Sequence, residues 1–244
     1  MSDRPLVLLA IFAHPDDESF RCGGTLALLA RRGIQVHSLT ATRGEAGSCG
    51  EPPVCRAEEL GVVREQELRC ACAALGIAPP IFLDYFDGKL AEVNEKNAVT
   101  RIIKEIQKLR PQVLLTWPSD GLSGHPDHIA VSCWTKQAYE EIVKNTEAPL
   151  ALYHLAIPHS VANALSLAKL YSIPDEDISL TVDVAEVWEQ KLAAIRCHRT
   201  QTGDSPILAA REEKQRLFLG KEYFTCALAN EDYDFLQSLI GKNV

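Results

Sequence analysis

The feature that most constrains the fold is a continuous apolar segment that ends in a dense charged cluster. Residues 5–13, PLVLLAIFA, carry no charge and have the length of a strand buried on both faces of a sheet. Residues 14–18, HPDDE, follow at once and bring one imidazole and three carboxylates. Carboxylates at the edge of a core are costly unless a cation or hydrogen bonds compensate for their burial. The segment therefore predicts a buried strand that ends in a ligand-binding cluster.

Strand and helix patterns alternate after this segment. Apolar runs predict further strands, and apolar residues at helical spacing predict the helices between them. The predicted strands are 34–42, 80–84, 112–117, 151–157 and 178–184, and the predicted helices are 23–32, 58–75, 99–109, 184–195, 207–219 and 231–240. Residues 43–55, rich in Gly, Cys and Pro, are predicted to form a functional loop because they are long for a simple connection.

This alternation predicts an α/β fold with a mostly parallel sheet and helices on both faces. Ligands of such sheets bind beyond the carboxyl ends of the strands, near the point where the strand order reverses. Three polar clusters follow predicted strands: 14–18, 43–45 and 119–128. They should meet at one rim and form the active site. With no repeat or convincing linker, residues 1–244 are predicted to form a single domain.

Composition excludes several classes of protein. The net charge of −8 and the absence of a basic stripe argue against nucleic acid as a partner. The N-terminus lacks the features of a signal peptide, and no apolar run is long enough to span a bilayer, so we expect a cytoplasmic protein. The eight cysteines form no C-x-x-C, and most are expected to be reduced residues of the core, although Cys49 and Cys55 bracket a loop and could pair.

A divalent metal would explain the charged cluster. His14 and Asp17 are natural first ligands, because a sharp turn after the strand can bring both side chains to one point. Catalytic zinc takes three protein ligands and leaves one position open. In GHPDHIAV, proline at the first helical position makes His125 the N-cap, so that His128 can face the rim as the third ligand. Two histidines and an aspartate suit zinc better than magnesium.

Helix capping is the competing interpretation. H-P-D-D and H-P-D-H could each be an N-capping turn, since acidic residues favour helix starts. The occurrence of both, each after an apolar strand of one sheet, favours a metal site.

The motifs AHPDDE and GHPDH, with CGGTLA, TRGE, REQELRCACAALG and KLAAIRCHRTQ, resemble the LmbE/PIG-L zinc de-N-acetylases in order from about residue 6 to 201. The two His-Pro-Asp motifs together are highly specific for that family. The resemblance implies a Rossmann-like sheet, one zinc ion held by His14, Asp17 and His128, and Asp16 as the general base. The chemistry agrees, because zinc lowers the pKa of bound water to about 7 and a neighbouring carboxylate can then remove its proton.

The resemblance also implies roles for the second motif. His125 would stabilise the oxyanion or protonate the departing amine, with Asp127 tuning it, although a role for His125 in capping alone stays open. In the mycothiol-pathway relatives a tyrosine two residues before this histidine helps to hold the oxyanion, whereas here the position is Ser123. Either zinc and His125 hold the oxyanion without it, or a group from another segment of the chain takes its place.

Four further residues are candidates for binding substrate. Arg64 lies on an inward stripe and could pair with Glu67, but the resemblance implies contact with the sugar instead. Arg43 and Glu45, in the loop after the second strand, could bind hydroxyls or a carboxylate, or be merely solvated. His198 stands in HRTQ where the family has His-x-Ser-Gln, which implies a place behind the ligands or at the substrate rim.

The predicted function is therefore zinc-dependent hydrolysis of the acetamide of an N-acetylglucosamine-type conjugate, a small-molecule partner, by a chain that could form a homo-oligomer. A zinc amidase for another amide, such as a thiol conjugate or a secondary metabolite, is the alternative. A non-catalytic metal- or sugar-binding protein is disfavoured, because a binder does not need Asp16. The turn after the first strand lacks G-x-G-x-x-G and the chain lacks G-x-S-x-G, which argues against a dinucleotide oxidoreductase and a serine hydrolase.

Overall fold

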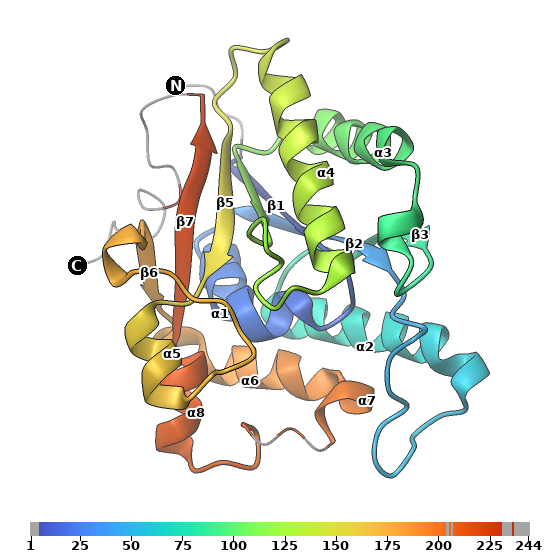
Figure 1. The fold of residues 1–244 in the computed structure, drawn as a ribbon, viewed down its shortest axis with the longest axis vertical. Helices are drawn as coiled ribbons and strands as arrows, with labels where there is room; N and C mark the ends of the chain where they lie inside the picture. The colour runs from blue at the N-terminus through green and yellow to red at the C-terminus, as the bar shows by residue number, and fades with distance from the viewer. Residues whose placement is uncertain (1–4, 204, 206, 231–235, 237–244) are drawn as a thin grey trace.

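The computed structural model describes residues 5–203, 205, 207–230 and 236. A seven-stranded sheet lies between two layers of helices (Figure 1). Its order is β3-β2-β1-β4-β5-β7-β6. The strands are β1 (Val7–Phe12), β2 (Gln35–Thr42), β3 (Ile81–Tyr85), β4 (Val113–Thr116), β5 (Ala151–Ala156), β6 (Leu180–Asp183) and β7 (Lys221–Ala229). β1 to β5 pair in parallel, and β7 runs antiparallel to β5 and β6, so the predicted mostly parallel α/β sheet is confirmed.

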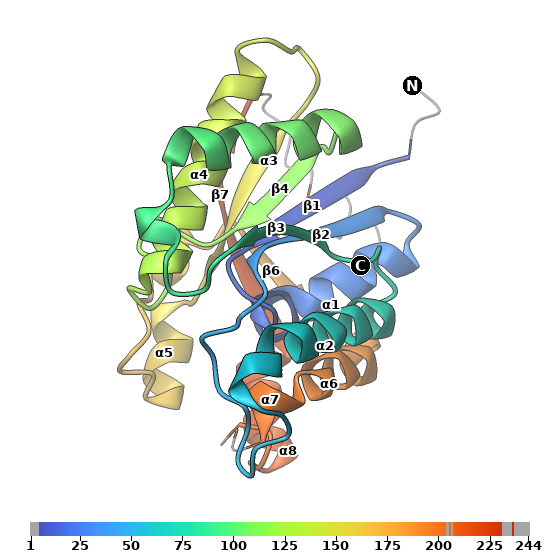
Figure 2. The same cartoon turned by 90° about the vertical axis from the view of Figure 1, so that its right-hand side faces the viewer.

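Helices cover both faces of the sheet (Figure 2). α1, α2 and α6 pack on one face, and α3 and α4 pack on the other. The helices are α1 (Asp17–Arg31), α2 (Leu60–Leu75), α3 (Glu95–Leu109), α4 (Pro126–Val143), α5 (His159–Leu165), α6 (Trp188–Cys197), α7 (Arg199–Thr202) and α8 (Glu212–Leu219). Single 3-10 turns span Ala57–Glu59, Leu90–Glu92, Asp175–Asp177 and Ala185–Val187.

β1 is the centre of the core. All six of its residues are buried, and its side chains alternate between the two helical layers. Leu8, Ala10 and Phe12 pack in the cluster of α1, α2 and α6, while Leu9 and Ile11 pack in the cluster of α3 and α4. Burial on both faces explains why this strand has no polar residue.

The first helix begins earlier than predicted. It starts at Asp17 rather than at residue 23, because the acidic residues assigned to the site also form its first turn, where the helix dipole favours them. The consecutive glycines inside the helix permit close packing: a Cβ on Gly24 would lie 2.4 Å from a methyl carbon of Val184. Only glycine fits at position 24. The two glycines therefore serve the packing of α1, which continues through both of them.

The prediction missed β7 entirely. Glu222 occupies an inward position of this strand, which hides the alternation of apolar residues expected of a strand. Its carboxylate accepts hydrogen bonds from the backbone N–H groups of Gly24 and Thr25 and lies 2.7 Å from the Lys191 ammonium. These partners compensate for burying the charge. Of the predicted helix 207–219 only Glu212–Leu219 is an α-helix, and the predicted helix 231–240 lies, except for Leu236, outside the described residues.

The cysteine pairing also differs from the prediction. Cys70 of α2 and Cys197 of α6 form a disulfide, whereas Cys49 and Cys55 carry free thiols. Cys22 and Cys72 are buried thiols of the core, but Cys133 and Cys226 are exposed, so the prediction that most cysteines are reduced core residues is wrong. The sequence did not reveal the bridge because its two cysteines are 127 residues apart, and only the packing of α2 against α6 brings them together.

Candidate metal centre and active site

The candidate site lies where the strand order reverses. β1 has β2 on one side and β4 on the other, so the loops after β1 and β4 diverge and leave a crevice at the carboxyl edge of the sheet. The loop after β1 carries His14 and Asp16 and leads into α1 at Asp17, and the loop after β4 leads into α4 through His125. The structure thus brings together two His-Pro-Asp motifs that lie far apart along the chain.

His14, Asp17 and His128 form a cluster that could hold a metal ion. One potential ligand atom from each lies within 4.8 Å of the others. Asp17 Oδ2 is 3.8 Å from His14 Nδ1, and Asp17 Oδ1 is 3.6 Å from His128 Nε2. All three side chains are largely buried. Two imidazoles and one carboxylate at this spacing fit a zinc ion.

Neighbouring groups orient two members of this cluster. Asp17 Oδ2 accepts hydrogen bonds from the backbone N–H groups of Ala13 and His14, which leaves Oδ1 facing His128. His128 Nδ1 lies 3.1 Å from the carbonyl of Gly121, and its ring stacks on Trp117 at 4.0 Å. A proton on Nδ1 that is donated to this carbonyl leaves Nε2 with a free lone pair toward Asp17.

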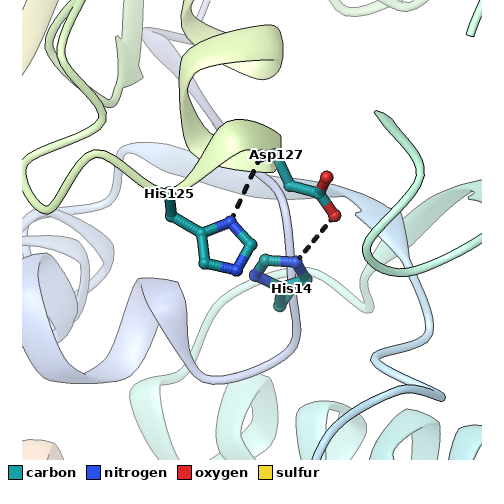
Figure 3. Close-up of side chains that lie close together, drawn as sticks. All are labelled: His14, His125 and Asp127. Atoms are coloured by element: carbon teal, nitrogen blue, oxygen red, sulfur yellow. Dashed lines mark hydrogen bonds and ion pairs between the residues drawn. The ribbon is translucent and has the colours of Figure 1, made fainter. Parts of the chain in front are cut away.

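The other nitrogen of His14 faces two carboxylates. His14 Nε2 lies 3.2 Å from Asp127 Oδ2 (Figure 3). The same atom lies 2.9 Å from Asp87 Oδ1. Burial disfavours the charged imidazole, but the hydrogen bonds to Asp127 and Asp87 and the charge of Asp17 outweigh it and raise the pKa of His14 to about 10. The carboxylates around His14 thus strongly stabilise positive charge, as a site that binds a metal cation must.

Asp87 was missed by the sequence analysis. A signal was available, because Asp87 follows β3 as the two motifs follow β1 and β4, and the carboxyl ends of parallel strands share an edge. Its loop matched no pattern that we could interpret.

Asp127 contacts His14 in addition to His125, the histidine that the sequence analysis assigned to it. Its carboxylate accepts from His14 and from the backbone N–H groups of Gly88 and Leu90. Burial raises the pKa of this carboxyl group, but these hydrogen bonds prevail and lower it. Asp127 also acts on His125: its charge opposes the lowering of the His125 pKa, and its N–H donates to His125 Nδ1 at 3.2 Å (Figure 3), so its role in tuning His125 stays a prediction.

His125 is the N-cap of α4 and Pro126 is its first residue, as the sequence predicted. Because Nδ1 accepts the N–H of Asp127, the proton of the neutral ring must lie on Nε2. Burial, together with the charges of His128 and His14, lowers the pKa of His125. His125 is thus a neutral imidazole with a hydrogen-bond donor at Nε2, and it is exposed at the site.

Asp16 has an unusual backbone conformation. Its φ of 111° lies in the region that favours glycine, and such outliers in a non-glycine residue concentrate at functional sites. Its Oδ2 lies 3.2 Å from Arg64 Nη2. Burial raises the pKa of Asp16 to about 6, although the charge of Arg64 opposes the shift. Asp16 lines a 210 Å³ cavity together with Asp17, His128 and Ser123.

Arg64 supports Asp16 rather than pairing with Glu67. Its side chain is almost fully buried, and its guanidinium donates to the carbonyls of Gly44 and Pro15 as well as to Asp16. Glu67 instead accepts from the N–H and hydroxyl of Thr200. The alternative intrahelical pair is absent because the loops after β1 and β2 offer Arg64 acceptors in the interior, while contact of Arg64 with a sugar remains a prediction.

His198 lies behind the cluster and not at a rim. It is fully buried, and its Nε2 lies 3.0 Å from Glu18 Oε1 and 3.2 Å from Ser19 Oγ. The other oxygen of Glu18 accepts the backbone N–H of Asp16. Of the two roles that the sequence left open for His198, the one at the substrate rim is corrected, because no part of this side chain reaches a surface.

Arg43 and Glu45 contact protein groups in this structure. Arg43 forms ion pairs with Glu65 and Asp84 and lies 4.7 Å above the ring of Phe82. Glu45 accepts the backbone N–H groups of Arg43 and Asp87. Glu45 therefore helps to fix the loop that carries Asp87, while contact of either residue with a substrate remains a prediction.

The fold and the site together define an α/β protein with a candidate site for a divalent metal, of the kind found in hydrolases. Comparisons with known proteins then identify the family. Residues 9–139 match the family model described as PIG-L, GlcNAc-PI de-N-acetylase. The chain belongs to this family, which confirms the resemblance seen in the sequence.

Individual relatives agree with this assignment. The chain is 31% identical to a 1D-myo-inositol 2-acetamido-2-deoxy-alpha-D-glucopyranoside deacetylase of Acidothermus cellulolyticus, with 89% of this chain and 87% of the relative covered. It is 35% identical to the deacetylase of the same description from Actinosynnema mirum, with 81% of each covered. The crystal structure of the conserved protein TT1542 from Thermus thermophilus has a TM-score of 0.67 at 27% identity and covers 91% of this chain and 95% of that one.

A search of the described residues for a helix long and apolar enough to cross a membrane found none.

Proposed function

We propose that this chain is a zinc-dependent N-deacetylase that hydrolyses the acetamide of an N-acetylglucosamine-type conjugate to acetate and an amine. One observation carries the proposal: a cluster suited to zinc shares a cavity with Asp16, a carboxylate outside that cluster. A protein that only binds metal has no need of such a group. The activity printed for the curated relatives supports the same reaction.

In this proposal His14, Asp17 and His128 hold one zinc ion. Zinc bound there would polarise the amide and lower the pKa of a water molecule to about 7. The Asp16 carboxylate then takes a proton from the attacking water, and it can return that proton to the nitrogen as the amine departs. Arg64 fixes the orientation of this carboxylate through the contact at 3.2 Å.

His125 supplies the hydrogen-bond donor that stabilises the oxyanion formed in the reaction. Its Nε2–H, set by the bond between Nδ1 and the N–H of Asp127, can donate to the amide oxygen as negative charge develops there. Of the two roles implied by the family resemblance, the geometry favours the neutral donor over the proton donor to the amine. Capping and catalysis are compatible, because the cap uses Nδ1 alone.

The test is an amine-release assay of the zinc-loaded protein on N-acetylglucosamine conjugates of inositol, malate, lipid and simple sugars. We expect release from at least one conjugate, loss of release after chelation, and recovery on adding zinc. Release from none of them by protein that elemental analysis shows to hold zinc would contradict the proposal. Activity on other amides alone would establish the zinc amidase alternative.

A further inference from the structure

Arg21 lies in the wall of the cavity that holds the candidate metal ligands. It follows Asp17 by one turn of α1, so the two side chains share a face of that helix. The 210 Å³ cavity is lined by Arg21 together with Asp16, Asp17 and His128. Arg21 also borders a second, small cavity that is lined by Phe218, Lys221 and Glu222. Among the described residues that line the 210 Å³ cavity, Arg21 is the one lysine or arginine, and the sequence analysis made no prediction about it.

The guanidinium of Arg21 has no acidic partner. Among the described residues, no carboxylate or carbonyl lies within ion-pair or hydrogen-bond distance of it, and its one contact of note is the ring of Phe218 at 4.6 Å. Arg64, by contrast, has three acceptors in the same region. Burial lowers the pKa of Arg21 to about 10. Arg21 is half-buried, so its N–H donors, which have no acceptor in the described part of the chain, are left to solvent or to a ligand.

The acids of the cavity do not serve as its partners. Asp16 faces Arg64, and Asp17 faces His14 and His128. The remaining walls near Arg21 are apolar, formed by residues such as Phe20, Leu122 and Leu170. An apolar wall with a single unpaired guanidinium suits a ligand group that carries negative charge, since a planar guanidinium binds carboxylate or phosphate oxygens in pairs.

We propose that Arg21 binds a carboxylate or phosphate group of the substrate, so that the enzyme prefers acidic N-acetylated sugar conjugates over neutral ones. This inference rests on the proposed deacetylase function and adds the charge class of its substrate. Arg21 is a specificity residue here: it contacts the part of the conjugate beyond the sugar and takes no part in the hydrolysis.

The experiment compares three compounds with the zinc-loaded protein: methyl N-acetylglucosaminide, its carboxymethyl counterpart, and N-acetylglucosamine 1-phosphate. For each, kcat/KM is measured with the wild type, Arg21→Gln and Arg21→Lys. We expect Arg21→Gln to lower the ratio of kcat/KM on acidic over neutral compounds by about 10- to 100-fold, mainly through KM. Arg21→Lys should restore part of the ratio. The acidic compound with the larger loss identifies carboxylate or phosphate as the preferred group.

Arg101→Gln is the matched control. Arg101 lies 4.9 Å above the ring of Tyr85, as Arg21 lies above Phe218, but it does not line the 210 Å³ cavity. Its replacement should leave the ratio unchanged. An equal change in both variants, or an unchanged ratio in Arg21→Gln, would overturn the inference while leaving the deacetylase function intact.

Binding measurements test the anion site at Arg21 independently of the proposed deacetylase activity. If the wild type hydrolyses none of the three compounds, calorimetric titration still measures their affinities for the wild type and Arg21→Gln. A fall of about 10-fold or more for the acidic compounds alone supports the anion site without any activity. Equal affinities in the two proteins contradict it.

Discussion

The conformation of Asp16 is the residue-scale feature on which the candidate site depends. A φ of 111° is a sparsely populated conformation for a non-glycine residue and costs on the order of 1–3 kcal/mol, so neighbouring groups must hold Asp16 in place. Glu18 accepts its backbone N–H, and Arg64 binds both its carboxylate and the carbonyl of Pro15. This turn directs Asp17 into the metal cluster while Asp16 stays outside it. The adjacent aspartates can therefore have different roles.

Asp16→Asn is expected to lower turnover by about two to four orders of magnitude, because the amide cannot accept the proton of the attacking water. Asparagine tolerates positive φ, so the turn should survive the change. Zinc content by elemental analysis, measured beside amine release, separates loss of the base from loss of metal. Near-normal turnover in the zinc-loaded variant would exclude Asp16 as the base.

His128→Ala is expected to lower the zinc content, because it removes one of three candidate ligands and leaves Asp17 Oδ1 without its imidazole neighbour. His159→Ala, at an exposed position on α5, is the control. Elemental analysis after dialysis against a weak chelator gives the comparison. Equal zinc in both variants would contradict the assignment of His128 as a ligand.

Residue types and spacing were sufficient to predict which side chains of the two motifs would meet. His14 and Asp17 follow β1, and His128 follows β4. Because parallel strands end at the same edge of a sheet, the order of these residues along the chain predicts that they come together, as they do. The contacts of Asp127 and Arg64 could not be predicted in this way. Each depends on which backbone group of a distant loop comes within reach, and loop conformation leaves no periodic signal in the sequence.

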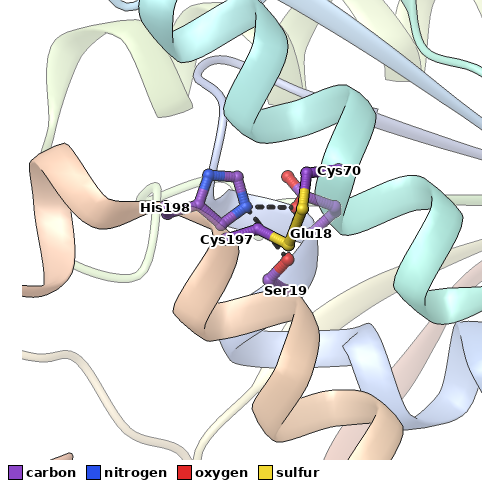
Figure 4. The surroundings of a disulfide bond; sticks show 5 residues. All are labelled: Glu18, Ser19, Cys70, Cys197 and His198. Carbon is purple, nitrogen blue, oxygen red and sulfur yellow. Dashed lines mark hydrogen bonds and ion pairs between the residues drawn. A yellow bond between two sulfur atoms is a disulfide. The ribbon is translucent and has the colours of Figure 1, made fainter.

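At the scale of elements, the disulfide connects α2 and α6, two helices that carry or adjoin residues in contact with the candidate site. Cys197 ends α6 and immediately precedes His198, which contacts Glu18 (Figure 4). α2 carries Arg64 and also Glu67, which binds Thr200 just beyond the bridge. The bridge therefore joins the helix that positions Asp16 to the segment that positions Glu18.

Removing this bridge is expected to destabilise the protein. Cys70→Ser with Cys197→Ser should lower the free energy of unfolding by about 2–4 kcal/mol, because a crosslink over a long loop restricts the unfolded chain. The control is Cys49→Ser with Cys55→Ser, which breaks no bridge. Urea unfolding of both variants, with and without reductant, gives the measurement. Reductant should destabilise the wild type and the control but not the first variant, and equal midpoints throughout would disprove the bridge.

Elements were predictable to the extent that their burial pattern was regular. β1 and the apolar stripe of α3 were evident because their inward positions are all apolar. β7 was not, since its inward Glu222 is neutralised by Lys191 and by two N–H groups of α1, which are far away in the sequence. In a sequence, a buried charged residue whose partners lie far away along the chain cannot be distinguished from a charged residue of the surface.

At the scale of the whole molecule, the sheet places the candidate site at the carboxyl edge of its parallel strands and buries paired polar groups between its helical layers. His154 of β5, which pairs in register with Thr116 of β4 and Thr225 of β7, differs from these groups. Among the described residues its buried Nε2 has no hydrogen-bond partner. Burial, with the charge of Lys136, lowers the pKa of His154 to about 4, while Asp120 opposes the shift.

This histidine makes the stability of the protein sensitive to acid. In the unfolded chain its pKa is about 6.5, so between pH 6.5 and 4 the unfolded state binds a proton that the folded state does not. The free energy of unfolding should therefore fall as the pH decreases through this window, by at most about 3 kcal/mol from this group, and the contribution is fully present above pH 6.5. His154→Phe removes the titrating group, and urea unfolding of both proteins at pH 7.5 and pH 4.5 measures the difference. Because both proteins share all other titrating groups, the decrease should be smaller in the variant, and equal decreases would show that His154 is protonated in the folded state.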